Sequence, residues 1–104
     1  MANYVFAYSG GNGVSADEAE RAAQYAEWGQ WFGKLGSAVV EGGAATGPAK
    51  TVGSGGSVSD GGSRGLTGYS IVSADSLDSA VELAKGCPVL DTGGAVDVYE
   101  AIAM

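Results

Sequence analysis

The chain has 104 residues, 45% of them apolar, which is the length and composition of one globular domain spanning residues 1–104. Its net charge of −7 disfavours nucleic acid and anionic membranes as partners. Cys87 is the only cysteine and histidine is absent, so we expect no intrachain disulfide, no zinc or haem site and no cofactor. Without a membrane-length apolar run or a secretory leader pattern, the sequence predicts a cytoplasmic protein.

The first segment predicts a strand followed by a long helix. In Asn3–Tyr8 the side chains alternate between two faces that both look buried, with the aromatic residues on one of them. Ser15, with Glu18 three residues later, forms a capping box for a helix over Ala16–Leu35 that stops at Gly36.

Trp31 stands apart from the apolar stripe of this helix. The stripe has the 3,4 spacing of a core face and consists of Ala22, Tyr25, Trp28, Phe32 and Leu35. Trp31 lies about a quarter turn away from it, given roughly 100° per residue. We expect a half-buried edge of the core, with a pocket wall or a subunit contact as the alternatives.

The middle of the chain predicts short strands and glycine-rich loops. A second strand is expected at Ser37–Glu41 and a loop at Gly42–Pro48. Beyond it, Lys50–Val52 and Ser57–Ser59 have the pattern of two short strands around a turn, and Asp60–Gly65 is a further loop.

The segment from Leu66 to Pro88 has the clearest pattern in the sequence. Leu66–Ser73 predicts a strand that is apolar on both faces, with Gly68 marking a bulge or a close backbone approach. A helix follows, capped by Asp75 or Ser76 and ended by Gly86 and Pro88. A turn at Val89–Gly94 then leads to a last strand at Ala95–Ile102.

This order predicts an α+β fold of the ferredoxin-like βαββαβ type, with both helices on one face of an antiparallel sheet. The other face would then present a mixture of tyrosines, valines, Phe6 and Ile71 to water. Because burial of apolar surface is favourable by about 25 cal/mol per Å², we expect a homodimer with the sheets packed face to face.

The chain resembles the YCII-related proteins, particularly the branch marked by an Asp-Gly-Pro-Phe motif. The matching residues, strongest from Asp60 onward, are Asp60-Gly61, Gly68-Tyr69, Ser76-Leu77-Asp78, the helix body Ala80–Lys85, Cys87-Pro88 and the strand at Gly94–Tyr99. Gly62-Ser63 replaces the Pro-Phe half of the motif.

This resemblance implies a dimeric α/β barrel. The family mostly lacks established activities; some members look like accessory proteins near sigma factors, and others are similar to small-molecule isomerases. The His-Asp pair proposed as acid and base in another branch has no counterpart here, because the chain has no histidine.

Asp60 is the candidate catalytic residue, as a carboxylate base whose pKa apolar and tyrosyl neighbours would raise. Its candidate ligand-binding neighbours are Tyr8, Ser9, Trp31, Lys50 and Tyr69. Since Asp-Gly is first of all a turn signal, the alternative is that Asp60 only makes a turn with Gly61.

Three functional hypotheses follow from the sequence. The first is a dimeric barrel that binds a small molecule, with weak acid–base chemistry. The second is a non-catalytic accessory or structural dimer, for example in transcriptional regulation. The third is a nucleotide-binding fragment, because Gly11-x-Gly13-x-x-Ala16 follows a strand and opens a helix.

Overall fold

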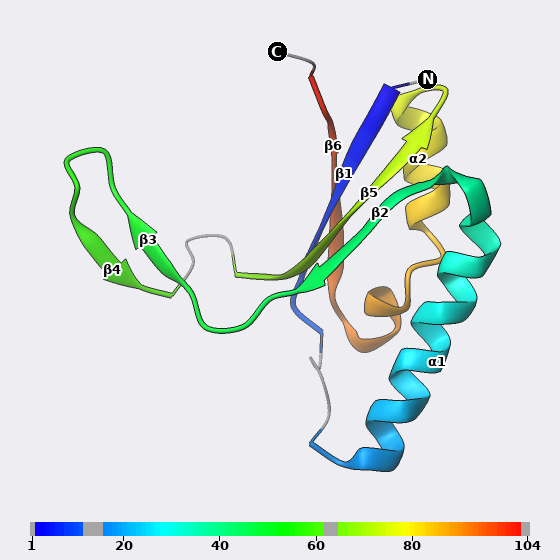
Figure 1. The fold of residues 1–104 in the computed structure, drawn as a ribbon, viewed down its shortest axis with the longest axis horizontal. Helices are drawn as coiled ribbons and strands as arrows, with labels where there is room; N and C mark the ends of the chain where they lie inside the picture. Colours follow the sequence, from blue (N-terminus) through cyan, green and yellow to red (C-terminus); the bar gives the residue numbers. More distant parts are fainter. Residues whose placement is uncertain (1, 12–15, 62–64, 103–104) are drawn as a thin grey trace.

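A computed structural model describes residues 2–11, 16–61 and 65–102 of the chain (Figure 1). Its elements in chain order are β1 (Ala2–Ser9), α1 (Glu18–Leu35), β2 (Val39–Ala45), β3 (Lys50–Val52), β4 (Val58–Asp60), β5 (Leu66–Ala74), α2 (Leu77–Ala84) and β6 (Ala95–Glu100). Among these described residues, neither helix is long and apolar enough to span a membrane.

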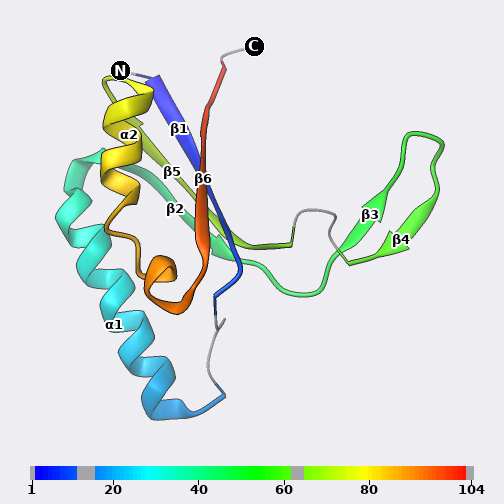
Figure 2. The ribbon, with the colours of Figure 1, turned by 180° about the vertical axis from the view of Figure 1, so that it is seen from behind.

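Four strands form one sheet in the order β2-β5-β1-β6, and every neighbouring pair is antiparallel. Phe6 at the centre lies opposite Ser70 of β5 and Val98 of β6. Both helices cover the same face of this sheet (Figures 1 and 2). The predicted α+β class with an antiparallel sheet is therefore confirmed, and the strand order is consistent with the ferredoxin-like arrangement.

The antiparallel pairing contradicts the nucleotide-binding hypothesis. A dinucleotide-binding unit needs β1 and β2 as parallel neighbours, but here β5 lies between them. Residues 12–15 of the glycine motif lie outside the described residues.

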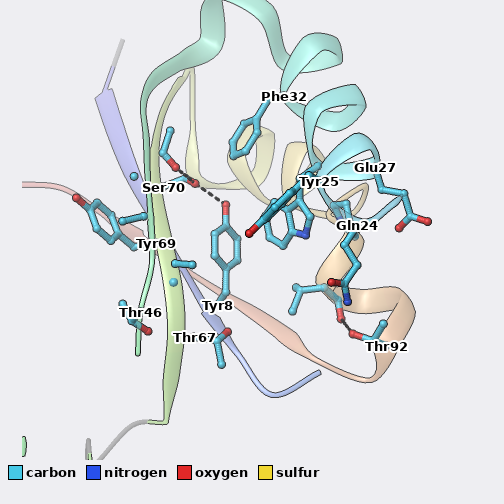
Figure 3. Close-up of a pocket in the computed structure, with 18 of the residues that line it drawn as sticks. Tyr8, Gln24, Tyr25, Glu27, Phe32, Thr46, Thr67, Tyr69, Ser70 and Thr92 are labelled. Atoms are coloured by element: carbon cyan, nitrogen blue, oxygen red, sulfur yellow. Dashed lines mark hydrogen bonds between the residues drawn. The ribbon is translucent and has the colours of Figure 1, made fainter. Parts of the chain in front are cut away.

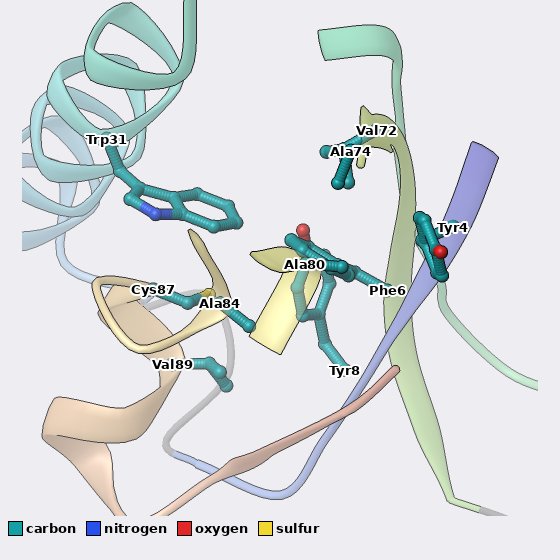
Figure 4. Close-up of a cluster of buried hydrophobic side chains, with 10 residues drawn as sticks. All are labelled: Tyr4, Phe6, Tyr8, Trp31, Val72, Ala74, Ala80, Ala84, Cys87 and Val89. Carbon is teal, nitrogen blue, oxygen red and sulfur yellow. The ribbon is translucent and has the colours of Figure 1, made fainter. Parts of the chain in front are cut away.

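The core lies between the sheet and the helices (Figure 4). Alternation along β1 points Tyr4, Phe6 and Tyr8 toward the helices, so the expectation that Phe6 faces away from them is wrong. The buried cluster consists of these three with Trp31, Val72, Ala74, Ala80, Ala84, Cys87 and Val89.

Trp31 is central to this core. Only 5% of its surface is exposed, so the expectation of a half-buried edge position is wrong. Its ring stacks on Phe6 at 6.1 Å between centroids, and its Nε1 donates to the Leu83 carbonyl oxygen of α2 at 3.2 Å. This bond joins the two helices and satisfies a donor that burial would otherwise leave unpaired.

The helix ends follow the capping rules with two corrections. α1 is capped by Asp17, whose carboxylate accepts from the Glu20 amide at 3.1 Å; the predicted cap, Ser15, lies outside the described residues. Gly36 ends α1 as predicted. Ser76 caps α2, accepting from the Ser79 amide at 3.1 Å.

The second correction concerns the end of α2. Its last cap is Lys85 in helical geometry, and Gly86 does not end it. Pro88 begins a 3₁₀ helix over Pro88–Thr92, where a missing amide proton costs nothing, and Gly93 ends it with φ of 84°. The predicted turn before β6 is therefore a short helix packed on the core.

β2 differs most from its prediction. A 3₁₀ turn precedes it, and the strand continues through Ala45, where a loop was expected. Its register with β5 shifts between Val39 and Glu41 and again between Glu41 and Ala44. Gly43 sits in the second shift with φ of 77°. The glycine-rich run is thus an irregular strand and not a loop.

The open face of the sheet, away from the helices, carries Val5, Ala7, Tyr69, Ile71 and Tyr99. The Tyr69 hydroxyl donates to Glu41 on this face at 3.0 Å. β3 and β4 pair with each other in a separate hairpin over residues 50–60, which we call the arm. The arm projects on the open-face side of the sheet, opposite the helices (Figures 1 and 2).

Candidate functional site

A cleft of about 380 Å³ lies between α1 and the part of the sheet where β2 diverges (Figure 3). The helix supplies one wall, the bulged segment of β2 with β5 supplies another, and the 3₁₀ helix closes one end. The lining side chains include Tyr8, Gln24, Tyr25, Glu27, Trp28, Phe32, Thr46, Thr67, Ser70, Val89 and Thr92. The surface is mainly apolar, with a few polar groups, as expected of a small-molecule pocket.

Aromatic rings form the wall between the cleft and the core. Trp28 meets Tyr8 edge-on, with ring centroids 4.9 Å apart and planes at 74°. Phe32 lies one turn along α1, 6.0 Å from Trp28. The 3,4 stripe of α1 includes Tyr25, Trp28 and Phe32, so this stripe faces the cleft as well as the core.

The polar groups at the inner wall form a short chain of hydrogen bonds that all run in one direction, which we call the relay. The Tyr8 hydroxyl donates to Ser70 Oγ at 2.8 Å, and Ser70 Oγ donates to the Gly42 carbonyl oxygen at 2.7 Å. Because a carbonyl oxygen can only accept, the Ser70 proton is committed to Gly42. Ser70 must then accept from Tyr8, which leaves lone pairs on the Tyr8 oxygen as an acceptor.

Burial raises the pKa of Tyr8 well above its usual value of 10.0, against the smaller opposite effect of the Ser70 hydrogen bond. Tyr8 is therefore a neutral phenol across the physiological pH range. It is suited to accept a hydrogen bond and not to act as a phenolate base.

Close backbone contacts hold the β2 wall in place. A Cβ at Gly43 would overlap the Tyr69 carbonyl oxygen, and a Cβ at Gly68 would lie 3.0 Å from the Ala44 oxygen. The predicted close approach at Gly68 is therefore present. These two glycines let β2 press against β5 beside the ring of Tyr8.

The structure brings only part of the predicted site together. Tyr8 lines the cleft, and Tyr69 borders it, although the Tyr69 ring lies on the open face (Figure 3). Neither Ser9 nor Trp31 is among the described residues that line the cleft.

Lys50 and Asp60 pair with each other on the arm, with 2.5 Å between Nζ and Oδ1. Their side chains are 68% and 91% exposed. In a single chain, the candidate base thus stands in solvent on the arm, and it is not among the described residues that line the cleft. Figure 1 shows the arm projecting away from α1 and the sheet.

Sequence reasoning missed Ser70 and the helix residues of the cleft. Ser70 is the polar member of an inward-facing row, Gly68, Ser70, Val72 and Ala74, so strand alternation alone could have identified it. Trp28 and Phe32 pack against the core, as predicted, and also line the cleft, because helical periodicity does not tell a core residue from a pocket wall.

The structure also bears on thiol and metal chemistry. Cys87 is buried, and burial raises the pKa of its thiol to about 11, so it is not a thiolate at neutral pH. The described residues contain no group of three acidic, cysteine or histidine side chains placed to hold a metal ion.

No protein-family model matches this sequence, and no curated protein matches it.

Proposed function

We propose that this protein binds a small, neutral, largely flat molecule in the cleft between α1 and the sheet. The observation that carries the proposal is the relay from Tyr8 through Ser70 to Gly42 at the inner end of an aromatic cleft. The rings favour an apolar or aromatic body, and the free lone pairs of Tyr8 favour a hydrogen-bond donor on the ligand.

Binding fits the cleft better than acid–base catalysis does. Tyr8 is a neutral phenol with a raised pKa. The carboxylate of Glu27, which also lines the cleft, points away from Tyr8 (Figure 3). Weak acid–base chemistry by Asp60 stays part of the proposal only if the arm of a second chain brings it to a cleft.

The wider proposal places the chain among the YCII-related proteins, as a cytoplasmic face-to-face homodimer of the dimeric α/β barrel type. The strand order and the apolar open face support it. The alternative is a non-catalytic accessory or structural dimer. The exposed apolar side chains of Val52 and Val58 on the arm and of Tyr99 on the open face favour that alternative, because they would serve assembly and not a ligand.

The test compares the binding of phenols and indoles with that of their O-methyl and N-methyl analogues by isothermal titration calorimetry. We expect the unmethylated compounds to bind up to about tenfold more tightly, the value of one net hydrogen bond. Tyr8→Phe should remove this preference. Tyr69→Phe, which deletes a hydroxyl on the opposite face, is the matched control and should retain it.

A preference for donors that survives in Tyr8→Phe would contradict the assigned role of Tyr8. Failure of every compound to bind the wild-type protein would contradict the proposed small-molecule site and favour the alternative of a non-catalytic accessory dimer.

A further inference from the structure

The chain exposes more surface than a monomer of its mass. Its accessible surface is 6740 Å², whereas a folded monomer of 10.2 kDa has about 5,300 Å². Its radius of gyration of 14.8 Å also exceeds the roughly 13 Å of a compact domain of this length. The excess of about 1,400 Å² is more than the ~800 Å² that each partner buries in a standard interface.

The arm is the clearest source of this excess. Its two strands pair over three residues each, and its backbone hydrogen bonds, such as Gly53 to Ser57 and Gly61 to Ala49, stay within or directly beside it. Val52 and Val58 face each other across the hairpin and are 70% and 61% exposed. A lone two-stranded hairpin is only marginally stable in water, so this one needs a surface to pack against.

One side of the arm is suited to such packing. Strand alternation places Lys50, Val52, Val58 and Asp60 on the same side, while Thr51 and Ser59 point to the other. The docking side therefore combines an apolar pair with an ion pair and carries no net charge. An uncharged, partly apolar side is compatible with a strongly acidic partner.

The distribution of charge indicates what that partner is. Eight of the twelve acidic residues lie in or beside the helical elements: Asp17, Glu18, Glu20, Glu27, Asp75, Asp78, Glu82 and Asp91. On the open face only Glu41 and Asp97 are acidic, and Glu41 accepts the Tyr69 hydrogen bond. A basic partner would choose the helical side, whereas a second acidic copy approaches best through the open face.

We infer that the open face and the arm form one interface, in which the arm of each chain clasps a second copy of this chain. The inference rests on the proposed homodimer and adds that the arm of each chain packs against the partner and stabilises the dimer. We call this arm contact the clasp. Because the arm and the open face lie on the same side of the sheet, one partner meets both (Figures 1 and 2). Because of the two-fold axis, each arm contact then occurs twice in the dimer.

Analytical ultracentrifugation of the full chain over a concentration series tests the clasp. The variant V52T/V58T keeps the β-branched shape and removes only apolar contact from the docking side. We expect its dimer dissociation constant to rise on the order of tenfold or more, since both arms change together. Ser59→Thr puts the same residue on the opposite side of the arm and should leave the constant unchanged.

The outcomes separate the clasp from the dimer. A wild-type monomer at micromolar concentration would overturn both. A dimer that weakens in Ile71→Thr, on the open face, but not in V52T/V58T would overturn the clasp and retain the face-to-face dimer. Ligand binding in the cleft is measured separately and depends on neither result.

A second measurement does not rely on substitution. Equal amounts of ¹⁴N- and ¹⁵N-labelled protein are mixed and treated with a carbodiimide, which joins lysines to nearby carboxylates. We expect mixed-isotope cross-links from Lys50 of one chain to a carboxylate of the other. Cross-links from Lys50 confined to single chains, such as that to Asp60, would overturn the clasp.

Discussion

Replacing Gly43 with alanine tests whether the β2 wall of the cleft depends on one backbone conformation. Gly43 has φ of 77°, where an L side chain is strained. Its new Cβ would overlap the Tyr69 carbonyl oxygen and lie 2.7 Å from the Tyr69 carbonyl carbon. Both atoms belong to the backbone of β5, so the clash cannot be relieved by rotating a side chain.

The size of the effect follows from two contributions. A non-glycine residue in the left-handed region costs about 1–2 kcal/mol. Displacing one strand from another to relieve the overlap costs a further ~1–3 kcal/mol. We therefore expect Gly43→Ala to lower the free energy of unfolding by about 3 kcal/mol, a large part of the roughly 5–15 kcal/mol typical of a domain.

Two other glycines separate these contributions. Gly93 has φ of 84° and ψ of 10°, in the left-handed region, but nothing within 4 Å of a Cβ, so Gly93→Ala should show only the conformational cost of about 1–2 kcal/mol. Gly42 has open space and no left-handed backbone, so Gly42→Ala should be neutral or slightly stabilising.

Urea unfolding at fixed protein concentration, followed by tryptophan fluorescence, measures all three variants. The tryptophans lie in α1 and report on its packing against the sheet. A Gly43→Ala cost no larger than that of Gly93→Ala would refute the reasoning, because the overlap with Tyr69 would then contribute nothing.

Three further predictions concern the relay, the buried thiol and the arm. Ser70→Ala should lower the free energy of unfolding by about 1–3 kcal/mol in the same urea assay, because the Tyr8 hydroxyl and the Gly42 carbonyl lose their partner; an unchanged midpoint would contradict the relay. The pKa of Cys87 rises from 9.0 to about 11 on folding, so the unfolded chain releases this proton first, and the free energy of unfolding should fall as pH rises from about 9 toward 11. Cys87→Ala should flatten this part of the pH profile, and an identical slope in both proteins would exclude the thiol as its cause. Asp60→Asn should change stability by less than about 0.5 kcal/mol, since its pair with Lys50 is exposed in the single chain, and should leave calorimetrically measured binding in the cleft unchanged; lost binding would support Asp60 as a site residue.

The strands of the sheet were predictable because each carries its own alternation. In β1 the aromatic residues occupy every second position, and in β5 the small residues do. The antiparallel order then follows from two βαβ-like halves packed as one sheet. The extension of β2 was not predictable, because its glycines form a strand only through contact with the Tyr69 backbone, which local sequence does not contain.

The helical periodicity of α1 gave a wrong position for Trp31 for a related reason, since it too depends on contacts that are distant in the sequence. A wheel assumes that one stripe faces one core along the whole helix. Here Trp31 reaches the core through its contacts with Phe6 and Leu83, whereas Tyr25 lines the cleft and Trp28 contacts both. Which part of a stripe is core and which is pocket wall depends on the position of β2, and that position depends on Gly43.

The cleft persists because its two walls are held from opposite sides. Trp31 fixes α1 to α2 by a hydrogen bond to Leu83 and by stacking on Phe6, so the helix is anchored at the core. Gly43 and Gly68 hold β2 close to β5, so β2 cannot move toward the helix without breaking backbone contacts. Neither wall can therefore close on the other at low cost, and the rings of Trp28 and Tyr8 remain available between them. An apolar ligand would fill this space without first reorganising the protein, which is the condition for tight binding by a small molecule.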